Sequence, residues 1–320
     1  MREGGSRSSP GSEPDPIAEP AVPPADSMPH AEPMPPADSM PQAEPMPPAE
    51  PMAPDTATPA AATLPAIALH DTGAGPALLF LHAFPQDASQ WDHQVAALSG
   101  DFRCLRPDMW GCGDSPELPD PMLASLDGYA RAVLRSLDSA GVGQVVVIGL
   151  SMGGYAALAL LRLAPKRIRG LVLASTRASA DTPEQAENRR RMADLALRDG
   201  VETAVSMVKR ILGPRARDEP HIADPVVGRI RRCRPAGIAA CQVAMAGRPD
   251  RTALLAAMEV PALVIHGEQD GVVSLDEARA VAAALPRGEL AVLPGLGHLT
   301  NLEDPPAFTA ALRGFLAGIG

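Results

Sequence analysis

The stretch VVVIGLSMGGYAALALLRLAP, residues 145–165, decides the fold of this chain. It begins as an unbroken aliphatic run, typical of a strand covered on both faces, and continues as a run of helix formers. Ser151 lies at the junction, inside the pattern G-x-S-x-G formed by GLSMG, residues 149–153. A strand–turn–helix junction of this kind exposes the serine hydroxyl on a sharp turn, where side chains at the glycine positions would collide with neighbouring elements. The pattern predicts a reactive Ser151; the alternative is a helix N-cap with no further role.

Short aliphatic runs alternate with helical patterns from residue 76 onward. We expect strands over residues 77–82, 102–108, 144–150, 170–176, 262–267 and 290–294. Helices are expected at about 88–98, 122–140, 152–164, 275–285 and 305–318. Strands and helices in this alternation indicate an α/β fold with a doubly wound, mostly parallel sheet.

One interval of about 85 residues, between Ser175 and Ala262, breaks this rhythm. It contains helical patterns and no convincing strand; the patterns cover 183–199, 201–212, 225–233 and 249–258. We therefore expect a helical cap, about 177–258, inserted between two core strands. Its arginine-rich segments fit a solvated helix face, which is the commoner arrangement, or a pocket for an anionic substrate. These segments are NRRRM (188–192) and RIRRCR (229–234).

The first 62 residues differ in composition from the rest of the chain. They hold 17 of the 36 prolines, ten acidic residues, two arginines and no aromatic residue, in degenerate repeats of 12 to 13 residues. Such a segment has too little apolar surface to offset its ordering entropy, so we expect residues 1–62 to be a disordered, acidic, proline-rich tail. Residues 63–320 then form one domain, large enough for a substantial core.

Charge and residue content exclude several classes of function. The net charge is −10, of which the tail carries −8, and a body this close to neutral argues against a nucleic-acid partner. The four cysteines lack the spacing of a metal or dithiol site, and we expect no metal and no cofactor. No apolar run approaches the ~20 residues of a membrane span, and the first residues lack a secretory signal. We expect a cytoplasmic protein with no membrane partner; the sequence leaves its oligomeric state open.

A serine hydroxyl is a weak nucleophile, so Ser151 needs a base that is itself oriented by an acid. Suitable groups follow two later strands: EQD (268–270) and GLGH (295–298). Because catalytic groups in open parallel sheets gather at the carboxyl edge, we expect Ser151 as nucleophile, Asp270 as acid and His298 as base. Glu268 is the competing carboxylate, and His266, inside its strand, is expected to be a packed histidine.

Attack on a carbonyl creates an oxyanion that needs two hydrogen-bond donors. The backbone N–H of Met152, the residue after the nucleophile, is the first candidate. The second should come from the loop HAFP (82–85), where Phe84 is the candidate because Pro85 has no N–H. His82 and Trp110 are candidates for the wall of the substrate pocket.

Five motifs resemble, in order and spacing, those of the α/β-hydrolase superfamily with a helical cap: HAFP (82–85), DMWGCGDS (108–115), GLSMGG (149–154), HGEQD (266–270) and GHLTNLEDP (297–305). HAFPQDASQW (82–91) and TRASADTPE (176–184) are similar to small bacterial esterases, perhydrolases and enol-lactonases. Two features depart from the family: His82-Ala83 replaces its usual His-Gly, and only LPAIALHD (64–71) stands in place of its N-terminal hairpin.

The resemblance covers residues 64–320. It implies a metal-free serine hydrolase that cleaves a small-molecule ester or lactone through an acyl-enzyme on Ser151. We also expect Asp108 and Asp114 to bond backbone groups, and Glu303 to cap the last helix.

Two other functions fit the same residues. An acyltransferase or perhydrolase would use the same triad, with another nucleophile in place of water. A non-catalytic, ligand-binding member of the fold would act through its proline-rich tail. Dehalogenases and epoxide hydrolases are disfavoured, because those relatives place an aspartate where Ser151 stands.

Overall fold

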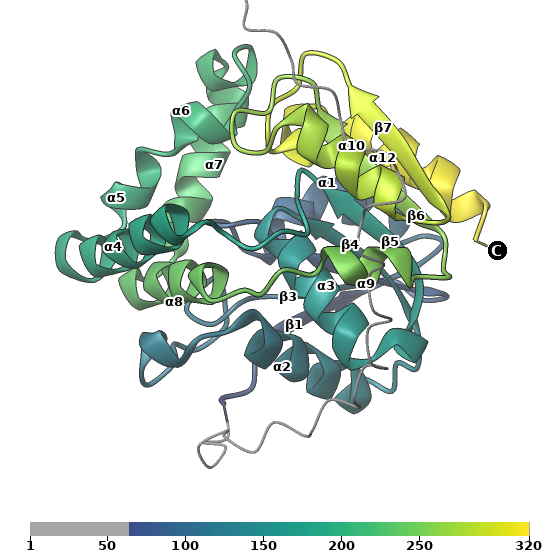
Figure 1. Ribbon diagram of the computed structural model, residues 1–320, viewed down its shortest axis with the longest axis horizontal. Helices are drawn as coiled ribbons and strands as arrows, with labels where there is room; N and C mark the ends of the chain where they lie inside the picture. Colours follow the sequence, from purple (N-terminus) through teal and green to yellow (C-terminus); the bar gives the residue numbers. More distant parts are fainter. Residues whose placement is uncertain (1–63, 320) are drawn as a thin grey trace, which may run out of the picture. The chain divides into compact units, whose positions relative to one another are not determined.

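The structure, a computed structural model, describes residues 64–319. They form a seven-stranded sheet with helices on both faces (Figure 1). The predicted tail, residues 1–62, lies outside the described residues. No helix in the described part of the chain is long and apolar enough to cross a membrane.

The sheet has the strand order β1-β3-β2-β4-β5-β6-β7, and every neighbouring pair is parallel except β1 with β3. All six predicted core strands are confirmed, with ends that differ by at most two residues. In chain order the strands are β1 (Leu69–Thr72), β2 (Ala77–Leu81), β3 (Arg103–Pro107), β4 (Val145–Leu150), β5 (Ile168–Ala174), β6 (Ala262–Gly267) and β7 (Gly288–Leu293).

The chain reverses its direction across the sheet between β2 and β4. From β2 it crosses to β3 on one side, and it then returns to β4 on the other side of β2. Ligands of open α/β sheets bind outside the carboxyl ends of the strands at such a reversal. The loop 82–85 follows β2 and Ser151 follows β4, so the sheet topology brings both to this point.

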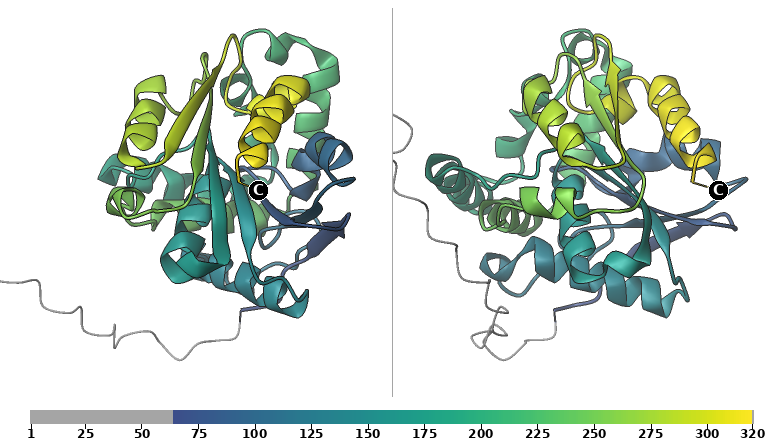
Figure 2. Two further views of the ribbon diagram at one scale, coloured as in Figure 1. Left: turned by 90° about the vertical axis from the view of Figure 1, so that its right-hand side faces the viewer. Right: turned by 45° about the vertical axis from the view of Figure 1, so that its right-hand side comes forward.

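Helices form a layer on each face of the sheet. Figure 2 shows α10 and α12 on opposite sides of β6 and β7. One layer contains α2 (Leu126–Ser139), α3 (Met152–Leu163), α9 (Thr252–Ala256) and α10 (Leu275–Ala284). The other contains α1 (Asp92–Leu98), which follows the 3-10 turn η3 (Ala88–Trp91), together with α11 (Thr300–Glu303) and α12 (Pro305–Ala317).

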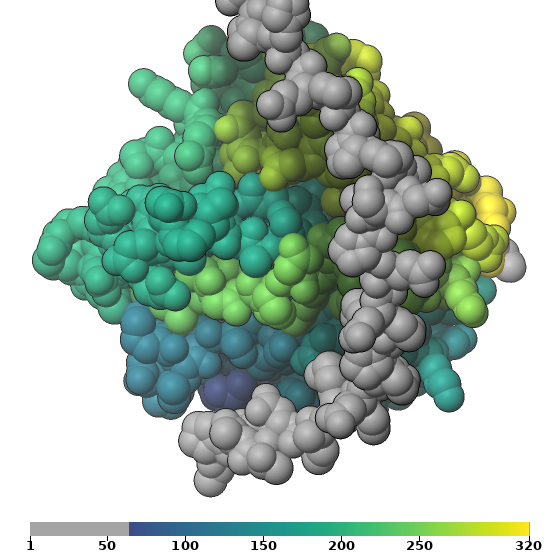
Figure 3. Space-filling model, in the orientation of Figure 1, coloured from purple at the N-terminus to yellow at the C-terminus, as the bar shows by residue number. Residues whose placement is uncertain are grey.

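The segment between β5 and β6 is helical, as expected, and no strand occurs within it. Before α9 it contains α4 (Pro183–Asp199), α5 (Glu202–Val205), α6 (Val208–Ile211), α7 (Pro220–Arg232) and α8 (Pro235–Ala246). Figure 3 shows α4 as a band along this face of the molecule with α8 directly beneath it. We call α4–α8 the cap helices.

The helix prediction for this segment was wrong in two places. The single helix expected over 201–212 is two short helices, α5 and α6, separated by Ser206 and Met207. The Ser206 hydroxyl donates to Thr203 O at 2.7 Å. Such local bonds compete with helix continuation. Helix α8 was not predicted, because eight of its twelve residues are buried and it therefore lacks an amphipathic pattern.

Candidate active site

The turn at Ser151 is held in a strained shape by its neighbours. Ser151 has φ 55° and ψ −113°, a region that non-glycine residues rarely adopt. A Cβ added at Gly153 would lie 2.0 Å from Leu81 O, and one at Gly149 would lie 2.3 Å from Gly153 O. Both glycines are therefore required by close approach, as expected. The Ser151 hydroxyl makes no capping bond to α3, which disfavours the N-cap interpretation.

Asp270 and His298, which follow β6 and β7, are hydrogen-bonded to each other. His298 Nδ1 lies 2.8 Å from Asp270 Oδ2, and both side chains are almost fully buried. The other carboxylate oxygen, Oδ1, accepts from Val272 N at 2.7 Å and from Val273 N at 3.0 Å. These bonds fix the carboxylate and direct it at Nδ1, which places the second ring nitrogen, Nε2, on the other side of the imidazole.

The charge state of Asp270 follows from the same contacts. Burial alone would raise the pKa of this carboxyl, but the nearby His298 and the two backbone N–H bonds outweigh it and lower the pKa. Asp270 is therefore ionised at neutral pH, where it can orient His298. Glu268, the competing acid, instead accepts from Gly295 N at 3.0 Å and does not bond His298.

The Ser151 hydroxyl makes no hydrogen bond to His298 within residues 64–319. Contacts between nucleophile and base are often long in unliganded sites and shorten when substrate binds. The structure thus joins Asp270 and His298 directly, and it places Ser151 at the carboxyl end of β4 on the same edge of the sheet.

The N–H groups of Phe84 and Met152 have no acceptor among the described residues. Their neighbours are occupied: Ala83 N donates to Gln90 Oε1 at 2.8 Å, and Gln86 N donates to Ala83 O at 2.9 Å. The close approach of Gly153 to Leu81 O also brings the start of α3 against the end of β2. Two unpaired N–H groups on these segments suit the stabilisation of an oxyanion.

A buried amide network joins the loop after β2 to the segment after His298. Gln90, whose Oε1 holds Ala83 N, donates from Nε2 to Asn301 Oδ1 at 3.1 Å. Asn301 Nδ2 donates to Gln90 O at 3.0 Å and to Gln94 Oε1 at 3.1 Å. All three amide side chains are fully buried. These residues were not predicted, because 211 residues separate Gln90 from Asn301 and neither belongs to a motif.

His82 and Trp110, the two residues predicted to line the substrate pocket, both have structural roles. His82 is almost fully buried; its Nε2 accepts from Met109 N at 3.0 Å, and its Nδ1 donates to Ala83 O at 2.9 Å. Trp110 is fully buried, donates to Pro65 O at 3.0 Å and packs edge-on against Tyr129. The structure gives Trp110 no free surface, so it does not support the prediction that this side chain lines a substrate pocket.

Glu303 does not cap the last helix, and this prediction is corrected. Asp304 caps α12 by accepting from Ala307 N at 2.9 Å. Glu303 instead holds the loop around His298, accepting from Gly297 N at 2.7 Å and from Leu299 N at 3.1 Å. Burial raises its pKa despite these bonds. In the sequence, this role is indicated only by the position of Glu303, five residues after His298.

Asp108 bonds backbone groups as expected, accepting from Ala88 N at 2.6 Å and from Asp114 N at 2.9 Å. Asp114 does not; its exposed carboxylate faces His70 at 3.6 Å. One potential metal-ligand atom each from His70, Asp108 and Asp114 lies within 4.8 Å of the others, a spacing that a metal site would need. Because both Asp108 oxygens already accept backbone bonds, we assign this group a structural role.

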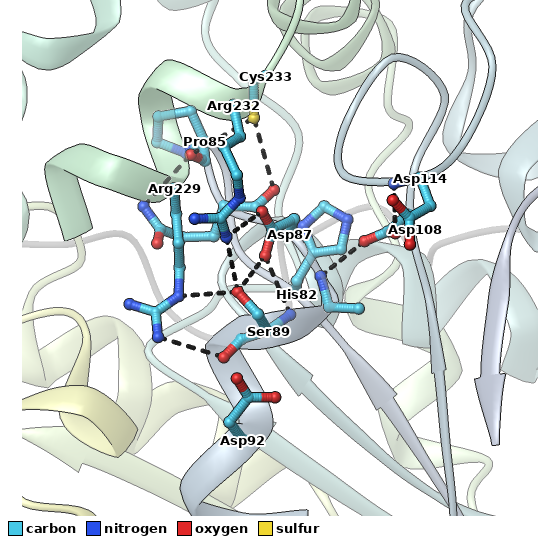
Figure 4. Close-up of polar contacts among 12 residues, drawn as sticks. His82, Pro85, Asp87, Ser89, Asp92, Asp108, Asp114, Arg229, Arg232 and Cys233 are labelled. Atoms are coloured by element: carbon cyan, nitrogen blue, oxygen red, sulfur yellow. Dashed lines mark hydrogen bonds and ion pairs between the residues drawn. The ribbon is translucent and has the colours of Figure 1, made fainter. Parts of the chain in front are cut away.

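Two arginines of RIRRCR, Arg229 and Arg232, join the cap to the segment after β2. Figure 4 shows Arg229 and Arg232 reaching Ser89 and Asp87, just beyond the loop of His82 and Pro85. Arg229 Nε donates to Ser89 Oγ at 3.1 Å, and Arg232 Nη2 lies 2.7 Å from Asp87 Oδ2. These contacts tie α7 to the segment that carries the unpaired N–H of Phe84.

Comparison with known proteins agrees with this fold. The profile of the Alpha/beta hydrolase family matches residues 78–312. The pimeloyl-[acyl-carrier protein] methyl ester esterase of Nitrosomonas europaea is 30% identical over 253 residues, covering 76% of this chain and 97% of the relative.

Solved structures give the same result. A malate-bound thermophilic esterase from Thermogutta terrifontis has a TM-score of 0.77 and 36% identity, covering 79% of this chain and 93% of that one. The enol-lactonase from Burkholderia xenovorans has a TM-score of 0.72 and 27% identity, covering 78% and 96%. These relatives are hydrolytic enzymes that share the fold.

Proposed function

The chain belongs to the α/β-hydrolase family, and on that premise we propose that it is a serine hydrolase cleaving a carboxylic ester or lactone through an acyl-enzyme on Ser151. The observation that carries the proposal is the buried Asp270–His298 hydrogen bond, at the sheet edge where a strained turn presents Ser151. The esterase and lactonase relatives support the class of substrate.

The proposed reaction starts when Ser151 Oγ attacks the carbonyl carbon and His298 Nε2 takes the hydroxyl proton. Asp270 remains ionised and stabilises the imidazolium through Nδ1. The tetrahedral intermediate then collapses, the ester or lactone C–O bond breaks, and His298 returns the proton to the leaving oxygen. Water attacks the acyl-enzyme by the same route and releases the acid.

The N–H groups of Phe84 and Met152 would hold the oxyanion during both steps. Because both lack an acceptor in the described structure, they need not break a protein hydrogen bond to do so. Removing one donor of this kind typically costs two to three orders of magnitude in kcat. The strained backbone at Ser151 supports its proposed role as nucleophile, since strained backbone is concentrated at functional positions.

The variant Ser151→Ala tests the proposal. We expect it to lower kcat/KM for p-nitrophenyl esters by about a thousandfold or more, because the nucleophile is removed. Its circular dichroism and unfolding midpoint should stay close to those of the wild type. Ester hydrolysis at the wild-type rate in this variant would contradict the proposal.

Ser175→Ala is the matched control. Ser175 directly follows the neighbouring strand β5 and also has a positive φ of 45°, but its side chain is fully buried. This variant should retain ester hydrolysis, which separates loss of the nucleophile from loss of a serine at the sheet edge.

A further inference from the structure

A cavity of about 390 Å³ lies between the cap helices and the carboxyl edge of the sheet. Its core-side wall includes Arg177, after β5, and Val272, after β6. Its cap-side wall comes from α4, from the α5–α6 segment and from Gln242 on α8. We call it the arginine cavity, because Arg177, Arg189 and Arg210 are among its ten lining residues and none of the ten is acidic.

The core-side wall is connected to the proposed catalytic groups. Val272 N donates to Asp270 Oδ1 at 2.7 Å. Thr176, the residue before Arg177, donates from Oγ1 to Ser151 O at 2.9 Å. The loops that position Asp270 and Ser151 therefore also form part of this wall.

The charges around the cavity do not cancel. The buried carboxylate of Asp181 is shared by three guanidiniums: Arg177 at 3.0 Å, Arg248 at 2.8 Å, and Arg189. Glu277 supplies a second carboxylate, 2.9 Å from Arg177. Two carboxylates against three guanidiniums leave an excess of positive charge, in a place where Arg177 and Arg189 are mostly buried.

Arg210 adds a further charge without a counter-ion. It lies on the cavity wall, and within residues 64–319 its guanidinium has neither an ion-pair partner nor a hydrogen-bond acceptor. A neutral donor lies beside the arginines. Gln242 accepts from Arg189 Nη1 at 3.3 Å with its Oε1, and its amide N–H groups have no acceptor in the described part of the chain. A planar anion such as a carboxylate matches guanidinium and amide donors.

We infer that the arginine cavity binds a carboxylate of the substrate, so that the preferred substrates are esters or lactones carrying a negatively charged group away from the scissile bond. This inference rests on the proposed serine hydrolase function and deepens it. Of the two arginine-rich segments in the sequence, NRRRM therefore contributes to the site through Arg189, whereas RIRRCR anchors the cap.

The test compares monomethyl esters of succinate, glutarate and adipate with the corresponding dimethyl esters. The wild type should have a higher kcat/KM for at least one half-ester than for its neutral diester. In Arg210→Gln the ratio of the two kcat/KM values should fall about tenfold, the cost of one hydrogen bond to a charged group. The matched control Lys209→Gln removes a charge from the neighbouring residue of α6, outside the cavity wall, and should keep the ratio.

A binding measurement makes the result independent of turnover. Adipate, which has no ester bond, should bind the wild type in calorimetry and bind Arg210→Gln about tenfold more weakly. A wild type that favours no half-ester, or a ratio and adipate affinity unchanged in Arg210→Gln, would overturn the inference.

The two proposals fail in different ways. If Ser151→Ala abolishes hydrolysis of both ester types while Arg210→Gln leaves their ratio unchanged, only the carboxylate site is rejected. If both ester types are still hydrolysed by Ser151→Ala, the serine mechanism is rejected, and adipate binding alone then decides the carboxylate site.

Discussion

Gln90 joins two segments of the proposed site: the loop 82–85 after β2 and the segment after His298. Its side-chain oxygen holds Ala83 N next to the unpaired N–H of Phe84, and its side-chain nitrogen reaches Asn301, three residues after His298. Buried amide networks are worth most when every member is satisfied, because each unpaired group costs its full desolvation. We therefore propose that Gln90 is a positioning residue for the proposed oxyanion donor, Phe84 N–H, and for the proposed base, His298.

We predict that Gln90→Met lowers kcat for ester hydrolysis about tenfold or more and changes KM less, because the donor loop loses its fixed geometry. The unfolding free energy should also fall by about 1–3 kcal/mol, since buried partners are left unpaired. Steady-state kinetics and urea unfolding measure the two effects.

Gln94→Met is the matched control. Gln94 bonds Asn301 in the same network but, within residues 64–319, makes no hydrogen bond to the loop 82–85. It should lose comparable stability with a smaller effect on kcat. An equal loss of kcat in the two variants would show that Gln90 acts only through stability.

For single residues, the sequence indicates candidates that lie within a few residues of the end of a strand. Ser151, Asp270 and His298 each come after an aliphatic run, and parallel strands carry such residues to one edge. Gln90, Asn301 and Glu303 follow no such rule, because their partners are set by tertiary contacts. Trp110 was misplaced for a related reason: an aromatic residue near a motif packs in a core as readily as it lines a pocket.

Among the elements, α4 and the segment before it are held by Asp181. This carboxylate bonds Arg248 and Arg189, which join the start of the cap to α4 and to the segment after α8. Burial would raise the pKa of Asp181, but these two arginines outweigh it and lower the pKa to about 2. Its ionised form is therefore favoured by folding.

We predict that Asp181→Asn lowers the free energy of unfolding by about 3–5 kcal/mol near neutral pH, because buried guanidiniums lose their counter-ion. Since the pKa is depressed in the folded state, the contribution is complete above the unfolded value of about 3.9 and is lost as the pH falls toward 2. The difference between wild type and variant should thus shrink between pH 5 and pH 2 in denaturant titrations.

Asp199→Asn serves as the control for Asp181→Asn, because Asp199 pairs with Arg198 at the exposed end of α4. It should cost about 1 kcal/mol or less. A stability difference for Asp181→Asn that stays constant or grows toward pH 2 would contradict the assigned role.

Strands were easier to predict than cap helices for a physical reason. A buried parallel strand is a short aliphatic run whatever its neighbours are. A cap helix shows a pattern only if one side faces solvent, and α8 packs against α4 and the core on nearly all sides. The fold class was therefore evident from the sequence, whereas the arrangement of the cap was not.

At the scale of the whole molecule, three buried cysteines lie where the cap packs against the core. Cys112 Sγ, in the loop after β3, lies 3.7 Å from Cys241 Sγ on α8, and Cys233 at the end of α7 is also buried. A hydrogen bond with the Cys112 thiol, together with burial, raises the pKa of the Cys233 thiol. Burial raises the pKa of Cys104, in strand β3, to about 11.

We predict that none of the four thiols of the native protein reacts readily with Ellman's reagent at pH 8, and that all four react after unfolding. At that pH about one Cys104 thiol in a thousand is ionised, and burial further slows access. Absorbance during a guanidinium titration measures the reaction. Rapid modification of Cys233 or Cys241 in the native state, located by peptide mapping, would show that the cap does not pack on the core as described.

Covalent labelling tests the central claim most directly. The native protein is treated with a fluorophosphonate, and the modified peptide is identified by mass spectrometry. The account predicts one label per chain, on Ser151, retained in Ser175→Ala and absent from Ser151→Ala. A label on another residue, or no label on folded protein that hydrolyses esters, would contradict it.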